Sequence, residues 1–438
     1  MSMDRRGLTV LERFFRFKEN STDLRTEVVA GLTTFMTMAY IIFVNPSILE
    51  AAGLPRVPTV AATALAAAIP TLLMGFLTNY PFALASGMGL NAVLAYSVVQ
   101  GQGLSWQTAM GIVFVEGAIV TILVLTRIRE SVMNAIPMSL KRAIGVGIGL
   151  LIAYLGMQQA GWVTGSPATL TSFGSFHKME TVIATGGLVL ILVLMAWRIR
   201  GAILIGILAT AAIALACGIG KLPEQWLATP DFSTFGRLDI LGALKLSLVA
   251  TIFAFLITDF FDTMGTVIGV GGEAGYLRED GSLPRLGRVL LVDSFAAMWG
   301  AISSASSVTT YVESASGVSA GGRTGLTSIV VGILFLLAVF FAPVVSIVPA
   351  AATAPALIIV GFLLMTVVRD IPFGKLEEAF PAFLTIAVTP LTLSISRGIG
   401  YGFIAYTLVK LFSGKVREIH PLMAIVSALF AVSFVLQP

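Results

Sequence analysis

Long runs without a charged residue constrain this chain more than any other feature of its sequence. Thr324 to Val368 contains none in 45 residues, and Val57 to Thr126 contains one, Glu116, in 70. A membrane-spanning helix needs about 20 apolar residues, so each run must hold two or more spans. Only 11% of the chain is charged, whereas soluble domains carry about 25%. This composition disfavours a soluble enzyme, a nucleic-acid-binding protein and a disordered chain.

Turn residues divide the apolar runs into fourteen expected spans. The cuts fall at Asn79-Tyr80-Pro81, at Gly101 to Gly103 and at Pro343 to Pro349. The expected spans are 28–49, 57–77, 82–99, 106–126, 139–160, 180–197, 201–219, 242–270, 288–304, 307–320, 324–342, 350–368, 379–395 and 398–412. A last apolar stretch, 421–437, is compatible with a span, an interfacial helix or a helix packed on the bundle.

The distribution of lysine and arginine predicts the orientation in the membrane. We expect the spans to lie in the cell (plasma or inner) membrane with the N-terminus in the cytoplasm. In this orientation, 21 of the 27 basic residues fall in cytoplasmic regions. Cytoplasmic loops of membrane proteins are enriched in these residues. The basic and aromatic residues between Leu8 and Lys18 predict an amphipathic cytoplasmic segment at the membrane surface.

A weak internal repeat runs through the chain. Ile136-Pro137 and the three spans after it resemble Val348-Pro349 and the three spans after it. The same order of spans precedes each of these points, including one short segment rich in Gly or Ser. Seven spans followed by seven place the second copy upside down, which is the inverted architecture of many secondary transporters.

Ionisable residues at membrane depth are rare, and each is a candidate functional residue. The chain offers Glu116, Asp259, Asp262, Asp293 and Glu313. Asp259 and Asp262 are three apart on one helix face and would repel each other if both were ionised. One could then carry a proton while the other accepts a substrate N–H. The alternative is a pair that only caps or packs the helix.

The segment around Glu313 is too short and polar for a full span. Residues 309–311 favour extended backbone, and residues 314–320 favour a half-helix. Glu313 then either caps this half-helix or binds substrate near its N-terminus. The mirror segment in the first repeat carries Asn91, an amide that either caps its half-helix or faces a heteroaromatic ring edge. Glu116 fits helix–helix hydrogen bonding as well as function, and Asp293 is interpreted as an interfacial ion-pair partner.

Nothing in the sequence predicts a cofactor, a metal site or catalytic residues. Cys217 is the single cysteine, and the Gly-rich turn at 321–325 lacks the Gly-Lys-Ser/Thr of a phosphate loop. His177 and His420 lie in expected loops, so any proton coupling must use carboxylates. An intramembrane aspartyl protease would need its two aspartates on different helices, whereas Asp259 and Asp262 share one.

Several motifs resemble those of one transporter family. They are Gly31 to Tyr40 with Val44-Asn45-Pro46, Gly87 to Ala92, Asp259 to Thr266, Tyr311 to Gly317 and Gly321 to Thr327. Together they resemble the azaguanine-type purine permeases, the hypoxanthine/guanine/adenine permease branch of the nucleobase–cation symporters, also called nucleobase–ascorbate transporters. The resemblance runs from about Val10 to Ser413.

The resemblance implies an all-α polytopic membrane protein with fourteen spans in a 7+7 inverted repeat. Spans 3 and 10 would each combine a short strand with a half-helix. A core domain (28–126 and 242–342) would move against a gate domain (127–220 and 343–412). The cytoplasmic N-terminus (1–27) and an apolar C-terminal tail (413–438) would flank them, and homodimers would form through the gate.

The resemblance also implies proton symport of purine bases by an elevator-like motion, with sodium a weaker alternative. Asp259 and Glu313 would hold the base, Asn91 would shape the pocket, and Asp262 would couple the proton together with those two carboxylates. Gly89 and Phe260, in the same motifs, and Thr310, directly before Tyr311, are expected as further substrate contacts. Hypoxanthine and guanine fit better than adenine alone. A different solute on this scaffold, such as xanthine, uracil or an inorganic anion, is the alternative.

Overall fold

The computed structural model describes residues 5–126, 136–219, 225–278, 282–346 and 348–436. Within these ranges, nine helical stretches are long and apolar enough to cross a membrane. The first half contains α1 (Arg5–Phe14), α2 (Leu24–Met38), α3 (Ile41–Glu50), α4 (Arg56–Thr78), β1 (Leu84–Ser86), α5 (Met88–Ala92), the π-helix η1 (Val93–Gln100), α6 (Trp106–Leu125), α8 (Met138–Gln159), β2 (Val163–Ser166), β3 (Leu170–Phe173), α9 (Met179–Ala196) and α10 (Ala202–Ala216).

The second half has the same order of long and broken elements. It contains α11 (Ile240–Ala243), η2 (Leu246–Leu248), α12 (Val249–Glu273), α13 (Leu286–Ser303), β4 (Val308–Thr310), α14 (Ser314–Ser319), α15 (Gly325–Ala338), η3 (Val339–Phe341), α16 (Ala342–Ser346), α17 (Ala350–Met365), η4 (Thr366–Asp370), α18 (Leu376–Leu391), α19 (Ile395–Phe412), η5 (Val416–Glu418) and α20 (Pro421–Leu436). The fold is therefore the expected fourteen-span inverted repeat, with spans 3 and 10 built from β1–α5–η1 and β4–α14.

The structure departs from the expected spans in two places. The first span is divided into α2 and α3 by a turn at 39–40. A hairpin of β2 and β3, which pair Val163 with Phe173, follows α8 where the sequence shows only an uncharged stretch. The last apolar stretch forms α20, which packs on α19: the Ser427 hydroxyl donates to the Phe403 carbonyl over 3.0 Å.

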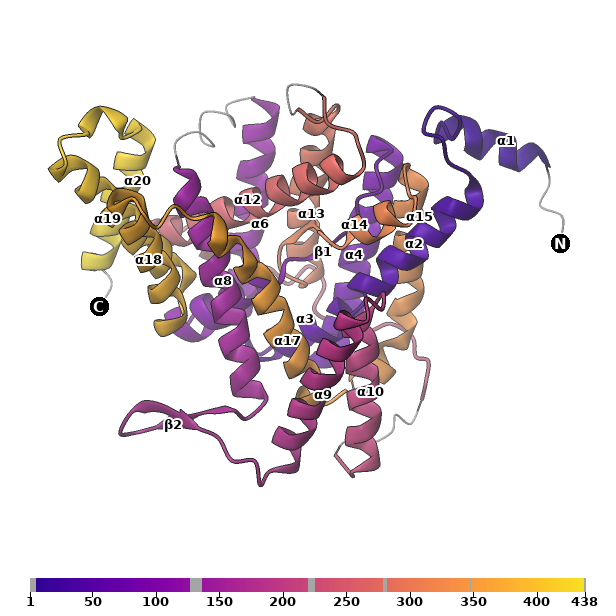
Figure 1. The fold of residues 1–438 in the computed structure, drawn as a ribbon, viewed down its shortest axis with the longest axis horizontal. Helices are drawn as coiled ribbons and strands as arrows, with labels where there is room; N and C mark the ends of the chain where they lie inside the picture. The colour runs from indigo at the N-terminus through magenta and orange to yellow at the C-terminus, as the bar shows by residue number, and fades with distance from the viewer. Residues whose placement is uncertain (1–4, 127–135, 220–224, 279–281, 347, 437–438) are drawn as a thin grey trace.

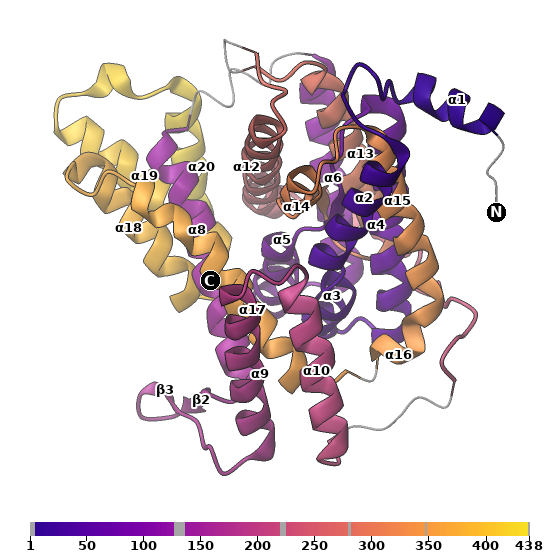
Figure 2. The ribbon, with the colours of Figure 1, turned by 45° about the vertical axis from the view of Figure 1, so that its right-hand side comes forward.

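The helices gather into two groups (Figures 1 and 2). Helices α2, α4, α6, α13 and α15 pack together, and α8, α17, α18 and α19 form the second group. Helix α12, the short helices α5 and α14 and the β1–β4 pair lie between them (Figure 2). The broken spans thus meet at the middle of the molecule.

Two related prolines begin two closely packed helices of the second group. Pro137 and Pro349 each precede the first residue of their helix, α8 and α17, in extended conformation. Proline suits this place because the first helical turn needs no hydrogen bond from its N–H. The two helices approach each other at glycines: a Cβ added at Gly149 would lie 2.7 Å from the Gly361 carbonyl oxygen.

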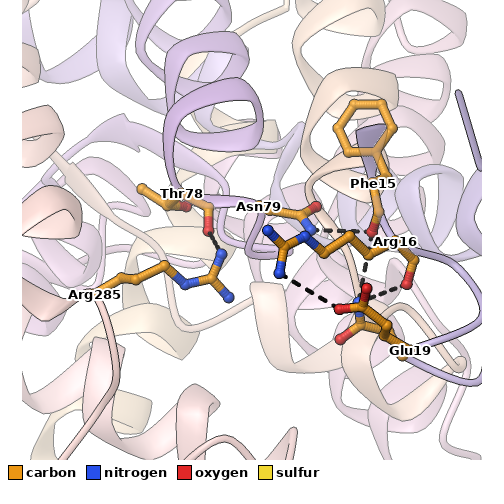
Figure 3. A network of polar contacts seen from close by, with 7 residues as sticks. Phe15, Arg16, Glu19, Thr78, Asn79 and Arg285 are labelled. Atoms are coloured by element: carbon orange, nitrogen blue, oxygen red, sulfur yellow. Dashed lines mark hydrogen bonds and ion pairs between the residues drawn. The ribbon is translucent and has the colours of Figure 1, made fainter. Parts of the chain in front are cut away.

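The N-terminal segment is tied to the C-terminal end of α4 (Figure 3). Asn79 ends α4 with φ 53°, a left-handed conformation that asparagine tolerates better than most residues. Its amide donates to the Phe15 carbonyl over 3.0 Å and accepts from the Gly325 N–H over 2.8 Å. Arg285 donates to the Thr78 carbonyl beside it over 2.6 Å. Phe15 is buried in this junction.

Candidate substrate site

The two broken spans meet through a two-stranded antiparallel sheet. Leu84 pairs with Thr310 and Ser86 with Val308. Three β-branched residues in a row, Val308 to Thr310, favour the extended conformation. The Tyr311 N–H donates to the Ala83 carbonyl over 2.9 Å at one end of the pair. This buried sheet fixes where the half-helices α5 and α14 begin.

Glu313 precedes α14 but does not cap it with its side chain. Its carboxylate instead accepts a hydrogen bond from the Tyr40 hydroxyl over 2.6 Å. Tyr40 is fully buried at the break between α2 and α3, whereas Glu313 is half-buried. The tyrosine therefore orients a carboxylate that still has accessible surface, which excludes the interpretation of Glu313 as a simple helix cap.

Asn91 lies inside α5 and is fully buried. Its amide N–H donates to the Asn45 side-chain oxygen over 2.6 Å. Asn45 in turn donates to the Thr63 hydroxyl over 2.9 Å and to the Ala305 carbonyl over 3.2 Å. Asn91 keeps an amide oxygen without a hydrogen-bond partner among the described residues. These hydrogen bonds join α3, α4 and α5, and the side-chain oxygen of Asn91 remains available as an acceptor.

Asp259 is fully buried on α12. The Ser307 hydroxyl donates to its Oδ1 over 3.1 Å, and its Oδ2 has no donor from the described residues. The side chain of Glu116, on α6, lies within hydrogen-bond reach of Asp259. Both residues are completely inaccessible.

Asp293 on α13 is held by three hydrogen bonds, so its interpretation as an interfacial ion-pair partner is wrong. Its Oδ2 accepts from the Thr263 hydroxyl over 2.6 Å. Its Oδ1 accepts from the Thr310 backbone N–H over 3.0 Å and the Thr310 hydroxyl over 2.8 Å. Hydrogen bonds of this kind stabilise a buried carboxylate, and here they join α12, α13 and β4.

The other predicted site residues surround this centre. Asp262, one turn after Asp259, is exposed and interacts electrostatically with Glu313. The two aspartates of α12 thus lie in different surroundings although they share a helix face. Phe260 is buried on the same helix. Gly89 is half-buried on α5, where a Cβ would lie 2.7 Å from Cγ2 of Ile148 on α8.

Sequence reasoning missed how four residues take part in this site. Tyr40 and Asn45 belong to motifs that carry the family resemblance, yet their partners are far away in the sequence. Glu116 and Asp293 are recognisable as intramembrane carboxylates, but the sequence does not place them. The signal for Glu116 is its isolation, because it is the only charged residue in a run of 70.

The site is rich in carboxyl groups and poor in cations. None of the ion pairs found among the described residues involves Glu116, Asp259, Asp262, Asp293 or Glu313. No group of three metal-ligating side chains occurs in the described ranges either. What the arrangement offers is a set of hydrogen-bond acceptors and proton-binding groups between two groups of helices.

A mostly helical, inverted-repeat fold with a polar centre at two broken spans is the architecture of many secondary transporters. Residues 25–436 match the model of the permease family. The chain belongs to that family, in its purine-permease branch, and is a multi-pass membrane transporter, not an enzyme. It is 43% identical over 438 residues to the guanine/hypoxanthine permease PbuG of Bacillus subtilis, covering 97% of this chain and 99% of that one. It is 41% identical over 430 residues to the adenine permease AdeP of Escherichia coli, covering 98% and 97%.

Solved structures of distant proteins share the fold. The transmembrane domain of a cyanobacterial bicarbonate transporter, BicA, matches with a TM-score of 0.66 at 13% identity, covering 85% of this chain and 97% of that domain. The murine anion transporter Slc26a9, in an inward-facing state, matches with a TM-score of 0.64 at 13% identity, covering 89% and 69%. At this identity the likeness concerns the architecture alone.

Proposed function

We propose that this chain imports purine nucleobases, hypoxanthine and guanine first and adenine as a further candidate, by proton symport. The observation that carries the proposal is the Glu313 carboxylate, oriented by Tyr40 and still accessible. A purine ring presents N–H donors along its edge, and hydrogen bonds to a charged acceptor contribute about 1.5–3 kcal/mol each. The relatives named as guanine/hypoxanthine and adenine permeases support the same substrate class.

The remaining site residues have separate roles in substrate binding and proton coupling. Asp259 offers its free Oδ2 as a second acceptor, while Asn91 offers an amide oxygen and sets the shape of the pocket. Gly89, Phe260 and Thr310 line the same region. Asp262, exposed and one turn from Asp259, takes part in proton coupling together with Asp259 and Glu313.

Transport by this scheme needs the two groups of helices to move. In the proposed mechanism the core (28–126 and 242–342) slides against the gate (127–220 and 343–412) like an elevator. The contact between Gly89 on α5 and Ile148 on α8 lies at the boundary between them. The N-terminus lies in the cytoplasm, the protein lies in the cell membrane, and two copies pair through their gates.

An inorganic anion, the substrate of the distant structural relatives, fits the site poorly. Five carboxyl groups without an ion-pair partner among the described residues would repel it. Xanthine and uracil are neutral bases that the geometry alone does not exclude, so they belong in the test.

The test is uptake of labelled bases by cells that lack their own permeases. We expect hypoxanthine or guanine to enter fastest, faster as the external pH falls, and uptake to collapse with a protonophore. Equal accumulation of sulfate or bicarbonate with no purine uptake would overturn the substrate class. Uptake that follows a sodium gradient and ignores the protonophore would overturn the coupling.

A further inference from the structure

We propose that Glu116 and Asp259 share a single proton, so that Glu116 is the residue that retains the transported proton while Asp259 contacts the base. The role of this pair in transport rests on the proposed function, whereas the sharing of one proton between the two carboxyl groups does not. Two carboxyl groups within hydrogen-bond reach can bond only if one of them is protonated. The proton then lies on an oxygen of one residue and is donated to an oxygen of the other.

Burial and missing partners make this pair different from the other carboxyl groups. Both oxygens of Glu116 and Oδ2 of Asp259 lack donors among the described residues, and both side chains are fully inaccessible. Removing a charge from water without giving it a partner is strongly unfavourable. A doubly ionised pair would carry two such charges side by side. The singly protonated pair carries one charge and satisfies one hydrogen bond.

Asp293 shows what an ionised carboxylate requires in this place. It accepts three hydrogen bonds from Thr263 and Thr310, whereas Glu116 accepts none from the described residues. The two acids lie on helices that pack against each other, α6 and α13. The donors from Thr263 and Thr310 therefore stabilise the charge on Asp293. The proton is then expected on the pair of Glu116 and Asp259.

Further acids lie near Glu116 and Asp259. Helix α6 packs against η1, α11, α12 and α13. Asp259 on α12 and Asp293 on α13 act directly on Glu116, and Asp262 acts on Asp259. Asp239, before α11, instead accepts from Thr108 near the start of α6, and Tyr96 of η1 is within hydrogen-bond reach of Gln159.

Substrate binding would then be linked to the proton. A base that donates an N–H to Asp259 favours the charge on Asp259 and the proton on Glu116. Base and proton should bind together, with affinity high at low pH and falling about tenfold per pH unit above the range in which the pair loses its proton. Loss of the proton from the loaded carrier on the cytoplasmic side would weaken base binding, so that both would be released there.

The central experiment compares Glu116→Gln with the unsubstituted protein purified in detergent and in liposomes. The introduced amide would be a permanent, neutral donor to Asp259 and thus imitate the protonated state. We expect base binding in Glu116→Gln to become independent of pH, purine exchange to continue, and purine-driven proton entry to be lost. Thr121→Val, on the same helix but bonded to its own backbone, is the matched control and should behave as the unsubstituted protein.

A spectroscopic measurement separates this inference from the proposed function. In infrared spectra of the protein without substrate, Glu116→Gln should remove the carbonyl band of a protonated carboxyl group. An unchanged band, or an unchanged pH slope of binding, would overturn the shared proton even if purine transport is demonstrated. Absence of purine transport with loss of the band would overturn the proposed function alone.

A shorter acid covers the case in which Glu116→Gln does not fold. Glu116→Asp keeps a titratable group and draws it back by one methylene from Asp259. We expect the protonated carboxyl band to remain and the pH midpoint of binding to move. A midpoint identical to that of the unsubstituted protein would show that Glu116 takes no part in the titration.

Discussion

The two broken spans begin with the same kinds of element and carry different chemistry. Each begins with a buried three-residue strand followed by a short helix, β1–α5 in the first repeat and β4–α14 in the second, and only the first continues directly into η1. Asn91 on α5 is neutral, fully buried and bonded to another amide. Glu313 before α14 is an acid, half-buried and bonded to a tyrosine. The repeat determines the backbone geometry, while single substitutions on it determine the chemistry.

The two half-helices also differ in what they pack against. Both half-helices contact α12, but α5 also packs against α3, α8 and η1, whereas α14 packs against α2. In the proposed division of the chain, α5 lies at the moving boundary and α14 inside the core. The first broken span would therefore control movement and pocket shape, and the second would hold the substrate.

The largest effect is expected from Glu313→Gln. The substitution keeps the shape of the side chain but removes its charge, which a base N–H and the Tyr40 hydroxyl both use. At about 1.5–3 kcal/mol for such a hydrogen bond, purine uptake should fall about ten- to a hundredfold. Initial uptake rates, normalised to surface expression, measure it. Glu180→Gln, an exposed acid at the start of α9, is the control, and near-normal uptake by Glu313→Gln would place the substrate elsewhere.

An intermediate effect is expected from Gly89→Ala. The new Cβ would lie 2.7 Å from Cγ2 of Ile148, and overpacking costs about 1–3 kcal/mol. We expect uptake to fall about fivefold or more and to recover in Gly89→Ala with Ile148→Ala, which removes the obstructing side chain.

The matching change on the other half-helix tests whether this effect belongs to the moving boundary. A Cβ at Gly317 of α14 would meet Thr34 of α2, within the same group of helices. Gly317→Ala should therefore lower expression or thermal stability, and Ile148→Ala should not restore it. Recovery of Gly317→Ala by Ile148→Ala, or none for Gly89→Ala, would contradict the proposed boundary.

The sequence predicts the scaffold better than the pairings within it. Charge-free runs locate the spans because the bilayer imposes their length, and the extended backbone expected at 309–311 overlaps the strand β4 (Val308–Thr310) of span 10. The bond between Tyr40 and Glu313 joins residues 273 apart, and no local pattern encodes such a distance. The prediction for Asp293 is wrong for the same reason: the arginines near it in sequence are visible, whereas its donors Thr263 and Thr310 come from other elements.

The smallest effect is expected from Asn91→Ala. This change removes one neutral hydrogen bond and leaves the Asn45 side-chain oxygen without its 2.6 Å donor, at a cost of about 1 kcal/mol. Because the Asn45 amide still donates to Thr63 and Ala305, α3 and α4 should stay in place. Purine affinity, measured by competition against labelled hypoxanthine, should weaken about fivefold.

The effects of Asn91→Ala and Glu313→Gln on purine affinity, compared with each other, test whether the two broken spans differ as proposed. Asn91→Ala should also alter the preference between hypoxanthine, guanine and adenine, because it enlarges the pocket without removing a charged contact. Glu313→Gln should weaken all three bases together, because an N–H donor is common to them. If Asn91→Ala were as damaging as Glu313→Gln and equally indifferent to the base, the amide would be a substrate anchor like the acid, and the two broken spans would be equivalent in function as well as in backbone.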